Sequence, residues 1–120
     1  MPQANIQIQV RNVSSAKSSG VYVFDIQGEI NAQAESVLMD TYTQAAGGGA
    51  RTIILNFEKL QYMNSSGIGL LVTLLIRIQR QKQQLFVCSL SDHYRQIFEL
   101  TRLNEAIGIF ATEAEALAAA

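Results

Sequence analysis

The sequence predicts an α/β fold, in which one mixed β-sheet is covered by packed helices in the order ββαβαβαβα. Near the start of the chain, apolar Ile6, Ile8 and Val10 alternate with polar residues, which is typical of a strand with one exposed face. The later run 53–55 is apolar without alternation and indicates a strand buried on both faces, as in a parallel sheet. We therefore expect a single domain over residues 1–120, with its core at about 6–117.

The first third of the chain predicts a hairpin followed by a helix. The polar stretch 14–19 separates the first strand from a second one at 21–26, and we expect the chain to leave this strand at Gly28-Glu29-Ile30. Asn31 is a residue type that caps helices, so the first helix is predicted to start there. The glycines at 47–49 then end it.

Strands and helices alternate along the rest of the chain. The central strand is predicted at 52–57, and Ser65 or Ser66 is expected to cap the second helix, which reaches about Arg80. The remaining predicted elements are a strand at 85–89, a helix capped by Ser91, a strand at 107–110 and a terminal helix in which Thr112 and Glu115 form a capping box.

The second helix carries more apolar residues than one face needs. Those that share the face assigned to the core are Ile68, Leu71, Val72, Leu75 and Ile78. Leu70 and Leu74 lie off this face, in line with Arg77, and a leucine pair beside a basic residue indicates a docking surface for a partner. The alternative is a wide apolar face that is wholly buried between the sheet and a neighbouring helix.

Composition excludes several classes of protein. Of the 120 residues 48% are hydrophobic and 16% charged, which excludes a disordered chain, and a net charge of -1 without a basic stripe argues against nucleic-acid binding. The longest uncharged apolar stretch, 68–76, has nine residues where a membrane span needs about 20, so we expect no span. Residues 1–5 lack the features of an export signal. The single cysteine, Cys88, lies in an apolar run, so we expect a buried thiol and a cytoplasmic protein.

The sequence offers no catalytic constellation and no metal-binding motif. His93 is the single histidine, and its place soon after Ser91 fits a solvated residue in a first helical turn better than a general base. One cysteine and one histidine at unrelated spacing do not supply a zinc site. The glycine run 47–49 lacks the Lys-Ser or Lys-Thr of a phosphate-binding loop. We therefore expect a protein that is not an enzyme and needs no cofactor.

Residues 62–69, with the sequence YMNSSGIG, are the most unusual segment. They lie between a buried strand and the first turn of the second helix, where unpaired backbone N–H groups and the positive end of the helix dipole are found. A phosphate added to a serine there would be accepted by these groups and would change the surface that is offered to a partner. The alternative is a serine that only caps its helix.

Three groups of residues together resemble the STAS domain family of sulphate transporters and anti-sigma factor antagonists, and most of all the bacterial anti-anti-sigma factors. They are Gly28-Glu29-Ile30-Asn31, then 53–57 followed by 62–69, and finally Ile109-Phe110 with 113–116. The resemblance extends from about Ile6 to Leu117. It implies the STAS-type fold, with the same order of strands and helices that the residues predict.

The resemblance also implies a function. In such family members, an anti-sigma factor that is also a serine kinase phosphorylates the first serine of an Asp-Ser-Ser-Gly or Asp-Ser-Thr-Gly motif, and the matching residue is Ser65. The unphosphorylated antagonist binds the kinase and frees the sigma factor, the phosphorylated form releases the kinase, and a metal-dependent serine phosphatase restores the first form. We expect the partner-binding residues on this loop and the following helix: Asn64, Ser65, Ser66, Gly67, Ile68, Leu70, Leu74 and Arg77.

Amides stand at three positions where the family usually carries aspartate, namely Asn31, Asn56 and Asn64. We expect Asn31 and Asn56 to line the site beside Asn64. Because asparagine forms hydrogen bonds without carrying charge, the site should tolerate phosphate better, or a standard kinase should no longer recognise it. The alternative function is a non-switching STAS module that serves as a scaffold or as an accessory subunit of a transport or signalling assembly.

Overall fold

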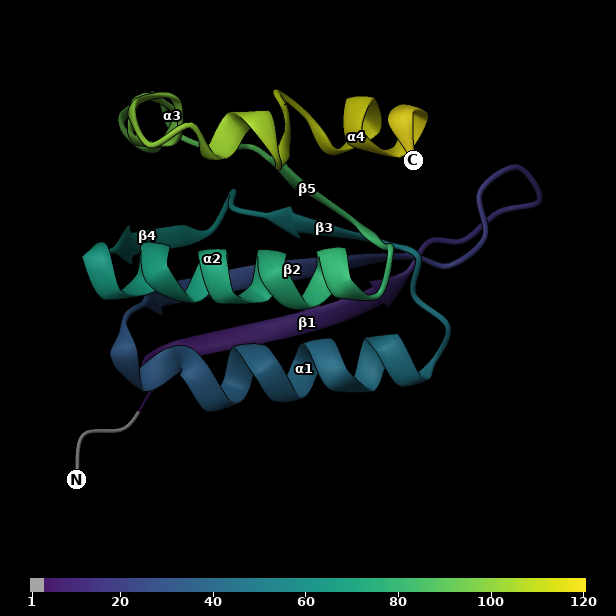
Figure 1. Ribbon diagram of the computed structural model, residues 1–120, viewed down its shortest axis with the longest axis horizontal. Helices are drawn as coiled ribbons and strands as arrows, with labels where there is room; N and C mark the ends of the chain where they lie inside the picture. The colour runs from purple at the N-terminus through teal and green to yellow at the C-terminus, as the bar shows by residue number, and fades with distance from the viewer. Residues whose placement is uncertain (1–3) are drawn as a thin grey trace.

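Six strands form one mixed sheet in the computed structural model, which describes residues 4–120 (Figure 1). The strands are β1 (Ile6–Asn12), β2 (Val21–Ile30), β3 (Thr52–Asn56), β4 (Leu60–Met63), β5 (Gln84–Cys88) and β6 (Gly108–Phe110). Their spatial order is β1-β2-β3-β5-β6, and β4 pairs with the end of β2. β1 and β2 are antiparallel, and all other pairs are parallel. The predicted mixed α/β fold is confirmed, while residues 1–3 of the predicted domain lie outside the described part of the chain.

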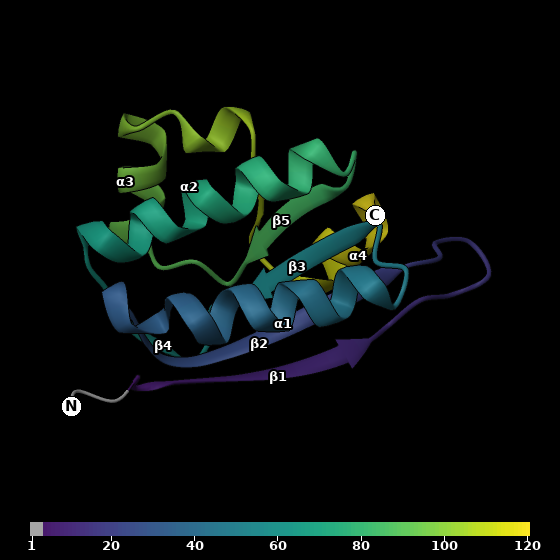
Figure 2. The same cartoon turned by 60° about the horizontal axis from the view of Figure 1, so that its bottom comes forward.

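Helices cover both faces of this sheet (Figures 1 and 2). The larger apolar core lies between one face and α1 (Glu35–Gly47), α2 (Ser65–Arg80) and α3 (Asp92–Leu100), and β3 contributes Ile53 and Leu55 to it. Ile54 belongs to a smaller core on the opposite face, which α4 (Glu113–Ala119) covers. Because the side chains of a strand alternate between its faces, the unbroken apolar run of β3 requires a covering layer on each side.

The structure corrects the end of the second strand. Gly28, Glu29 and Ile30 stay in β2, and β4, which the sequence did not predict, pairs in parallel with this extension. Gly28 has a φ of +101°, and a Cβ there would lie 2.3 Å from the carbonyl oxygen of Asn5, so only glycine lets β1 approach so closely. The observed order is therefore ββαββαβαβα. Strand β4 has four residues without clear alternation, which explains why the sequence pattern missed it.

The structure also corrects the buried face of α2. Leu70 and Leu74 are only 8% and 0% exposed, so the prediction that they form a docking surface is wrong and the alternative, a wide buried face, is confirmed. Ile68 and Val72, assigned to the core, are half-buried instead. The reason is that α2 packs against the sheet and α1 together, so the buried stripe is wider than one neighbour would require. Ile76, 43% exposed, is the exposed large apolar residue of this helix.

Several local predictions hold. Asn31 accepts a hydrogen bond from the Gln33 amide and caps a short 3₁₀ turn, Ala32–Ala34, that leads into α1. Ser91 and Thr112 cap α3 and α4. Cys88 is buried. No helix within residues 4–120 combines the length and the hydropathy that a membrane crossing requires.

Leu74→Ala should lower the free energy of unfolding by about 2–5 kcal/mol, because it leaves a cavity in the larger core. Ile76→Ala is a matched control two residues further along α2, and it should change stability by about 0.5 kcal/mol or less. Urea unfolding of both variants measures the difference. Equal losses in the two variants would contradict the burial of Leu74.

Candidate functional site

The first turn of α2 is capped by Asn64. Its side-chain Oδ1 accepts a hydrogen bond of 2.9 Å from the amide of Gly67, and its backbone amide donates to the carbonyl oxygen of Ile30 at 3.3 Å. Asn64 has extended backbone angles, as expected of a residue that precedes a helix. The prediction that Ser65 or Ser66 caps α2 is therefore wrong, and both serines are helical residues of the first turn.

Gly67 brings this turn against the end of β2. Its Cα is buried, and a Cβ at this position would lie 2.0 Å from the carbonyl oxygen of Ile30 and 2.9 Å from Cγ of Met63. A side chain would push α2 away from the sheet, so the glycine fixes where the helix starts. The start lies beside the carboxyl ends of β2 and β4, an edge where α/β proteins commonly place their sites.

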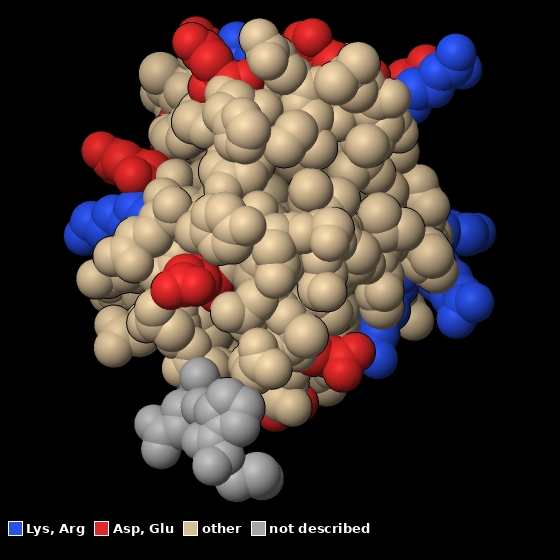
Figure 3. Space-filling model, turned by 90° about the vertical axis from the view of Figure 1, so that its left-hand side faces the viewer, with Lys and Arg blue, Asp and Glu red and all other residues tan. Residues whose placement is uncertain are grey.

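Ser65 and Ser66 are exposed at this helix N-terminus. The first turn of α2 contains no acidic residue. Figure 3 views the molecule from this side, and its charged side chains lie mainly toward the rim of an otherwise uncharged surface. Because the positive end of the helix dipole faces these hydroxyls, an added phosphate meets a favourable field and free backbone donors.

The structure brings only some of the other predicted residues to this place. Asn31 directly follows Ile30, whose carbonyl oxygen accepts from Asn64, so the two asparagines lie at the same edge of the sheet. Ile68 is half-buried in the next turn. Arg77 is exposed but lies twelve residues after Ser65, about 18 Å along the helix axis.

Asn56 does not line this site. Its side chain lies on the opposite face of the sheet, where Nδ2 donates to Oε1 of Glu113 at 3.1 Å and Oδ1 accepts from the amide of Glu58 at 2.9 Å. The alternation of β3 explains the difference, because Asn56 shares its face with Ile54 rather than with Leu55.

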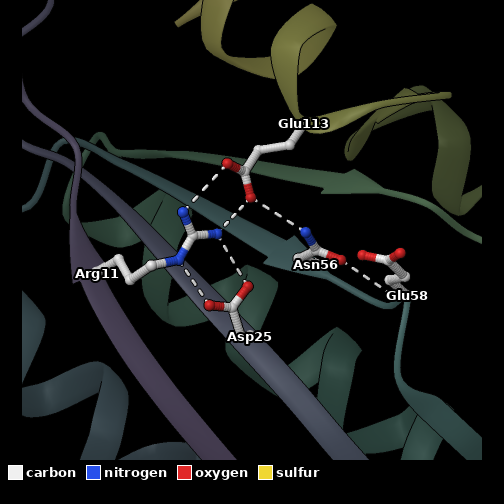
Figure 4. Close-up of polar contacts among 5 residues, drawn as sticks. All are labelled: Arg11, Asp25, Asn56, Glu58 and Glu113. Carbon is white, nitrogen blue, oxygen red and sulfur yellow. Dashed lines mark hydrogen bonds and ion pairs between the residues drawn. The ribbon is translucent and has the colours of Figure 1, made fainter.

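A second group of polar residues surrounds Asn56 (Figure 4). The guanidinium of Arg11 donates from Nε and Nη2 to Asp25 at 2.6 and 2.9 Å, and from Nη1 to Glu113 at 3.2 Å. Arg11 Nη2 also donates to Oε1 of Glu113. The residues border a cavity of about 480 Å³ lined by Gln9, Arg11, Asp25, Ile26, Asn56, Glu58, Lys59, Ser89, Thr112 and Glu113.

These contacts shift the ionisation of the groups that form them. The hydrogen bonds from Arg11, and then from Asn56, hold the pKa of Glu113 below its ordinary value. The hydrogen bonds to Asp25 and Glu113 raise the pKa of Arg11 above its own ordinary value. Burial raises the pKa of the nearby Cys88 thiol to about 11, so this sulfur is protonated at neutral pH and is a poor nucleophile. The cluster is thus suited to holding elements together rather than to proton transfer.

Sequence reasoning missed this cluster, although part of it left a signal. In the β1–β2 hairpin Gln9 pairs with Asp25 and Arg11 with Val23, so Arg11 and Asp25 are diagonal neighbours of opposite charge. A hairpin register built from the alternating pattern could have shown this pair. Glu113 left no such signal, because it joins Arg11 from a distance of 102 residues in the sequence.

Comparison with known proteins assigns the family. A sequence model of the STAS domain matches residues 12–116. The chain belongs to the STAS domain family. This STAS domain is 26% identical over 98 residues to the anti-sigma-B factor antagonist of Staphylococcus aureus, an alignment that covers 82% of this chain and 91% of the relative.

Solved structures agree with this assignment. The anti-sigma factor antagonist SpoIIAA in its unphosphorylated form superposes on this STAS domain with a TM-score of 0.71 at 26% identity, covering 92% of this chain and 94% of that one. The phosphorylated form of SpoIIAA from Bacillus gives a TM-score of 0.70 at 27% identity, covering 92% and 96% of the two chains. The predicted STAS-type fold is confirmed.

Asn64→Ala should lower the free energy of unfolding of this STAS domain by about 1 kcal/mol, because the Gly67 amide loses its acceptor. Ser66→Ala, the matched control in the same turn, should cost about 0.5 kcal/mol or less. Asn64→Asp should keep the stability of the parent, since aspartate caps helices as well as asparagine does. Thermal unfolding of the three variants tests this order, and a larger loss for Ser66→Ala than for Asn64→Ala would contradict it.

The free energy of unfolding should depend on pH in the acidic range because of Glu113. Since its pKa is lower in the folded than in the unfolded protein, its ionised form stabilises the fold above the ordinary glutamate pKa of about 4.3. This contribution is lost as the pH falls through the lower, folded value. Glu113→Gln should cost at most about 1 kcal/mol near neutral pH, because the ion pair is only partly buried, and nothing in strong acid. Urea unfolding across this pH range measures the difference, and a constant difference at all pH values would contradict the assignment.

Proposed function

We propose that this STAS domain is an anti-sigma factor antagonist that binds an anti-sigma factor with serine kinase activity and is released when Ser65 is phosphorylated. The observation that carries the proposal is the position of Ser65, an exposed hydroxyl in the first turn of α2 on a surface with few charges (Figure 3). Similarity to the S. aureus antagonist, and to SpoIIAA in phosphorylated and unphosphorylated forms, supports it. A serine phosphatase completes the cycle by restoring the unmodified form.

The place of Ser65 favours a switch in binding rather than in folding. Asn64, not Ser65, caps the helix, so the Ser65 hydroxyl can be modified while the cap remains intact. The phosphate adds about 1.5 to 2 negative charges, which the N-terminus of α2 accepts at little cost to the fold. A partner that covers the same uncharged surface would have to desolvate that charge. Phosphorylation therefore weakens the complex without unfolding the antagonist.

The proposed partner surface is centred on the start of α2. It comprises Asn64, Ser65, Ser66, Gly67 and Ile68, and Arg77 lies at the far end of the same helix. Two exposed apolar side chains replace the buried Leu70 and Leu74 as candidate contacts: Tyr62 of β4, which is 52% exposed and two residues before Asn64, and Ile76 of α2, which is next to Arg77 at the far end of the helix. Apolar side chains beside a polar hydroxyl are typical of protein interfaces.

Asparagine at position 64 changes the charge of the site and keeps its geometry. The amide oxygen caps α2 in the way that a carboxylate oxygen would. A carboxylate at this position would repel an adjacent phosphate and could help to position the metal of a kinase, whereas the amide carries no charge and does not repel the phosphate. The proposal therefore includes a Ser65 site that carries phosphate with less repulsion than the aspartate-containing motif does.

Phosphopeptide mapping after incubation with the cognate anti-sigma kinase, ATP and magnesium tests the proposal. The parent should be phosphorylated on Ser65, and Ser65→Ala should abolish the modification while keeping kinase binding, because a methyl group preserves the shape of the turn. Ser66→Ala is the matched control and should be phosphorylated like the parent. Phosphate on Ser66, or on neither serine with an active kinase, would overturn the assignment.

Asn64→Asp tests the effect of charge in the same assay. Because the cap geometry is preserved, any change in the phosphorylation rate reports the carboxylate and not a shift of the turn. We expect faster transfer by the kinase and a phosphorylated form that is less stable than that of the parent, since two negative groups then lie side by side. Unchanged rates and unchanged melting temperatures of both phosphoproteins would show that residue 64 does not tune the switch.

A further inference from the structure

The seven residues of α4 form the central part of the cover over the smaller apolar core. Five residues of the sheet face that lies under α4 are nearly inaccessible: Val21, Val23, Ile54, Phe86 and Cys88, with exposures between 0% and 8%. Ala116 of α4 is fully buried among them, and Leu117 and Ala120 pack at the margin. Without α4 these side chains would be covered only at their margin, by Val13 and by Phe110, whose ring packs edge-on against Phe86.

Helix α4 buries little apolar surface of its own against the sheet. Four of its seven residues are alanines, and Ala116 is its one fully buried residue. A helix of this length does not persist in water by itself, because its first turns cost more entropy than their hydrogen bonds return. The stability of α4 therefore comes from its contacts with the rest of the domain.

Polar contacts at its two ends supply much of the attachment. At the N-terminal end, Glu113 is held by the guanidinium of Arg11 and by the amide of Asn56 (Figure 4). At the C-terminal end, Ser18 Oγ donates to the carbonyl oxygen of Ala120 at 2.9 Å. Arg11 is kept in place by Asp25 and does not depend on α4 for its other hydrogen bonds. Arg11 therefore keeps its position when its hydrogen bonds with Glu113 are broken.

We propose that α4 is a hinged lid that opens as a unit at the Ala111–Thr112 connection while the rest of the domain stays folded. The contacts of Glu113 with Arg11 and Asn56 hold the lid closed. Opening exchanges the two partly buried hydrogen-bonded contacts of Glu113 for water and exposes the apolar face beneath. The remaining core, which contains the buried residues of α1, α2 and α3, shares no buried side chain with α4. Loss of the lid therefore leaves that core complete.

Cys88 provides a native probe for this motion. It is the single cysteine, it is 0% exposed, and it belongs to the apolar face beneath α4. Labelling of the full-length protein with 4,4′-dithiodipyridine, measured against urea concentration, separates two routes to the thiol. Opening of the lid exposes little surface and depends weakly on urea, whereas global unfolding depends on it as steeply as the equilibrium transition does. We expect the weak dependence at low urea.

Three variants test whether the contacts of Glu113 hold α4 closed. Glu113→Gln should accelerate labelling at low urea about fivefold, the factor that corresponds to the loss of one partly buried ion pair. Ala116→Gly, which removes the buried methyl group and loosens the helix, should accelerate it by more than tenfold without touching a charge. Glu58→Gln is the matched control, since it makes the same change of charge beside the same cavity on an exposed side chain, and it should label like the parent.

Leu74→Ala separates the lid from the main core. This change weakens only the larger core, so it should speed labelling at high urea and leave the rate at low urea unchanged. A urea dependence as steep as that of global unfolding in the parent would overturn the proposal. So would equal labelling rates for Glu113→Gln, Glu58→Gln and the parent in the absence of urea.

Discussion

The carbonyl oxygen of Ile30 joins the end of β2 to the start of α2. It accepts from the amide of Asn64 and lies where a Cβ of residue 67 would have to be. This contact constrains two positions. Residue 64 follows β4 and caps α2, and residue 67 must lack a side chain. The direction in which α2 leaves the sheet follows from this contact, and with it the wide buried face that includes Leu74. Ser65 lies between the two constrained residues, so its exposure is a consequence of how the junction is built.

The two faces of the sheet differ in the size of the apolar core on each and in the helices that cover it. On the face of α1 and α2, a large apolar core that includes residues of both helices holds the start of α2 in place. On the other face, a small apolar core is closed by a short alanine-rich helix and a group of charged side chains. Strand β3 belongs to both, since Leu55 and Ile54 point in opposite directions. Under the proposed opening of α4, the buried residues of the larger core keep their contacts, because none of them belongs to α4.

Prediction from sequence succeeded where the signal is local. The caps Ser91 and Thr112, the burial of Cys88 and the end of α2 at Arg80 follow from neighbouring residues. It failed at Leu70 and Leu74, because helical spacing gives the direction of an apolar stripe but not its width, which depends on how many neighbours pack against the helix. It also failed at β4, whose four residues are a strand because they pair with the extension of β2 at residues 28–30.

The sequence by itself determined the α/β class, the parallel core strand and the presence of a serine at the N-terminus of a helix, because each depends on periodicity or on residues within one turn. Only the tertiary structure decided that Asn64 and not a serine caps α2, because the choice depends on the contact with Ile30 on another strand. Only it separated Asn56 from Asn31 and Asn64, since the face on which a strand residue lies depends on the register of the sheet. The ion pair of Arg11 with Glu113 joins residues 102 positions apart, and no local pattern encodes a contact that forms only when the last helix packs on the sheet.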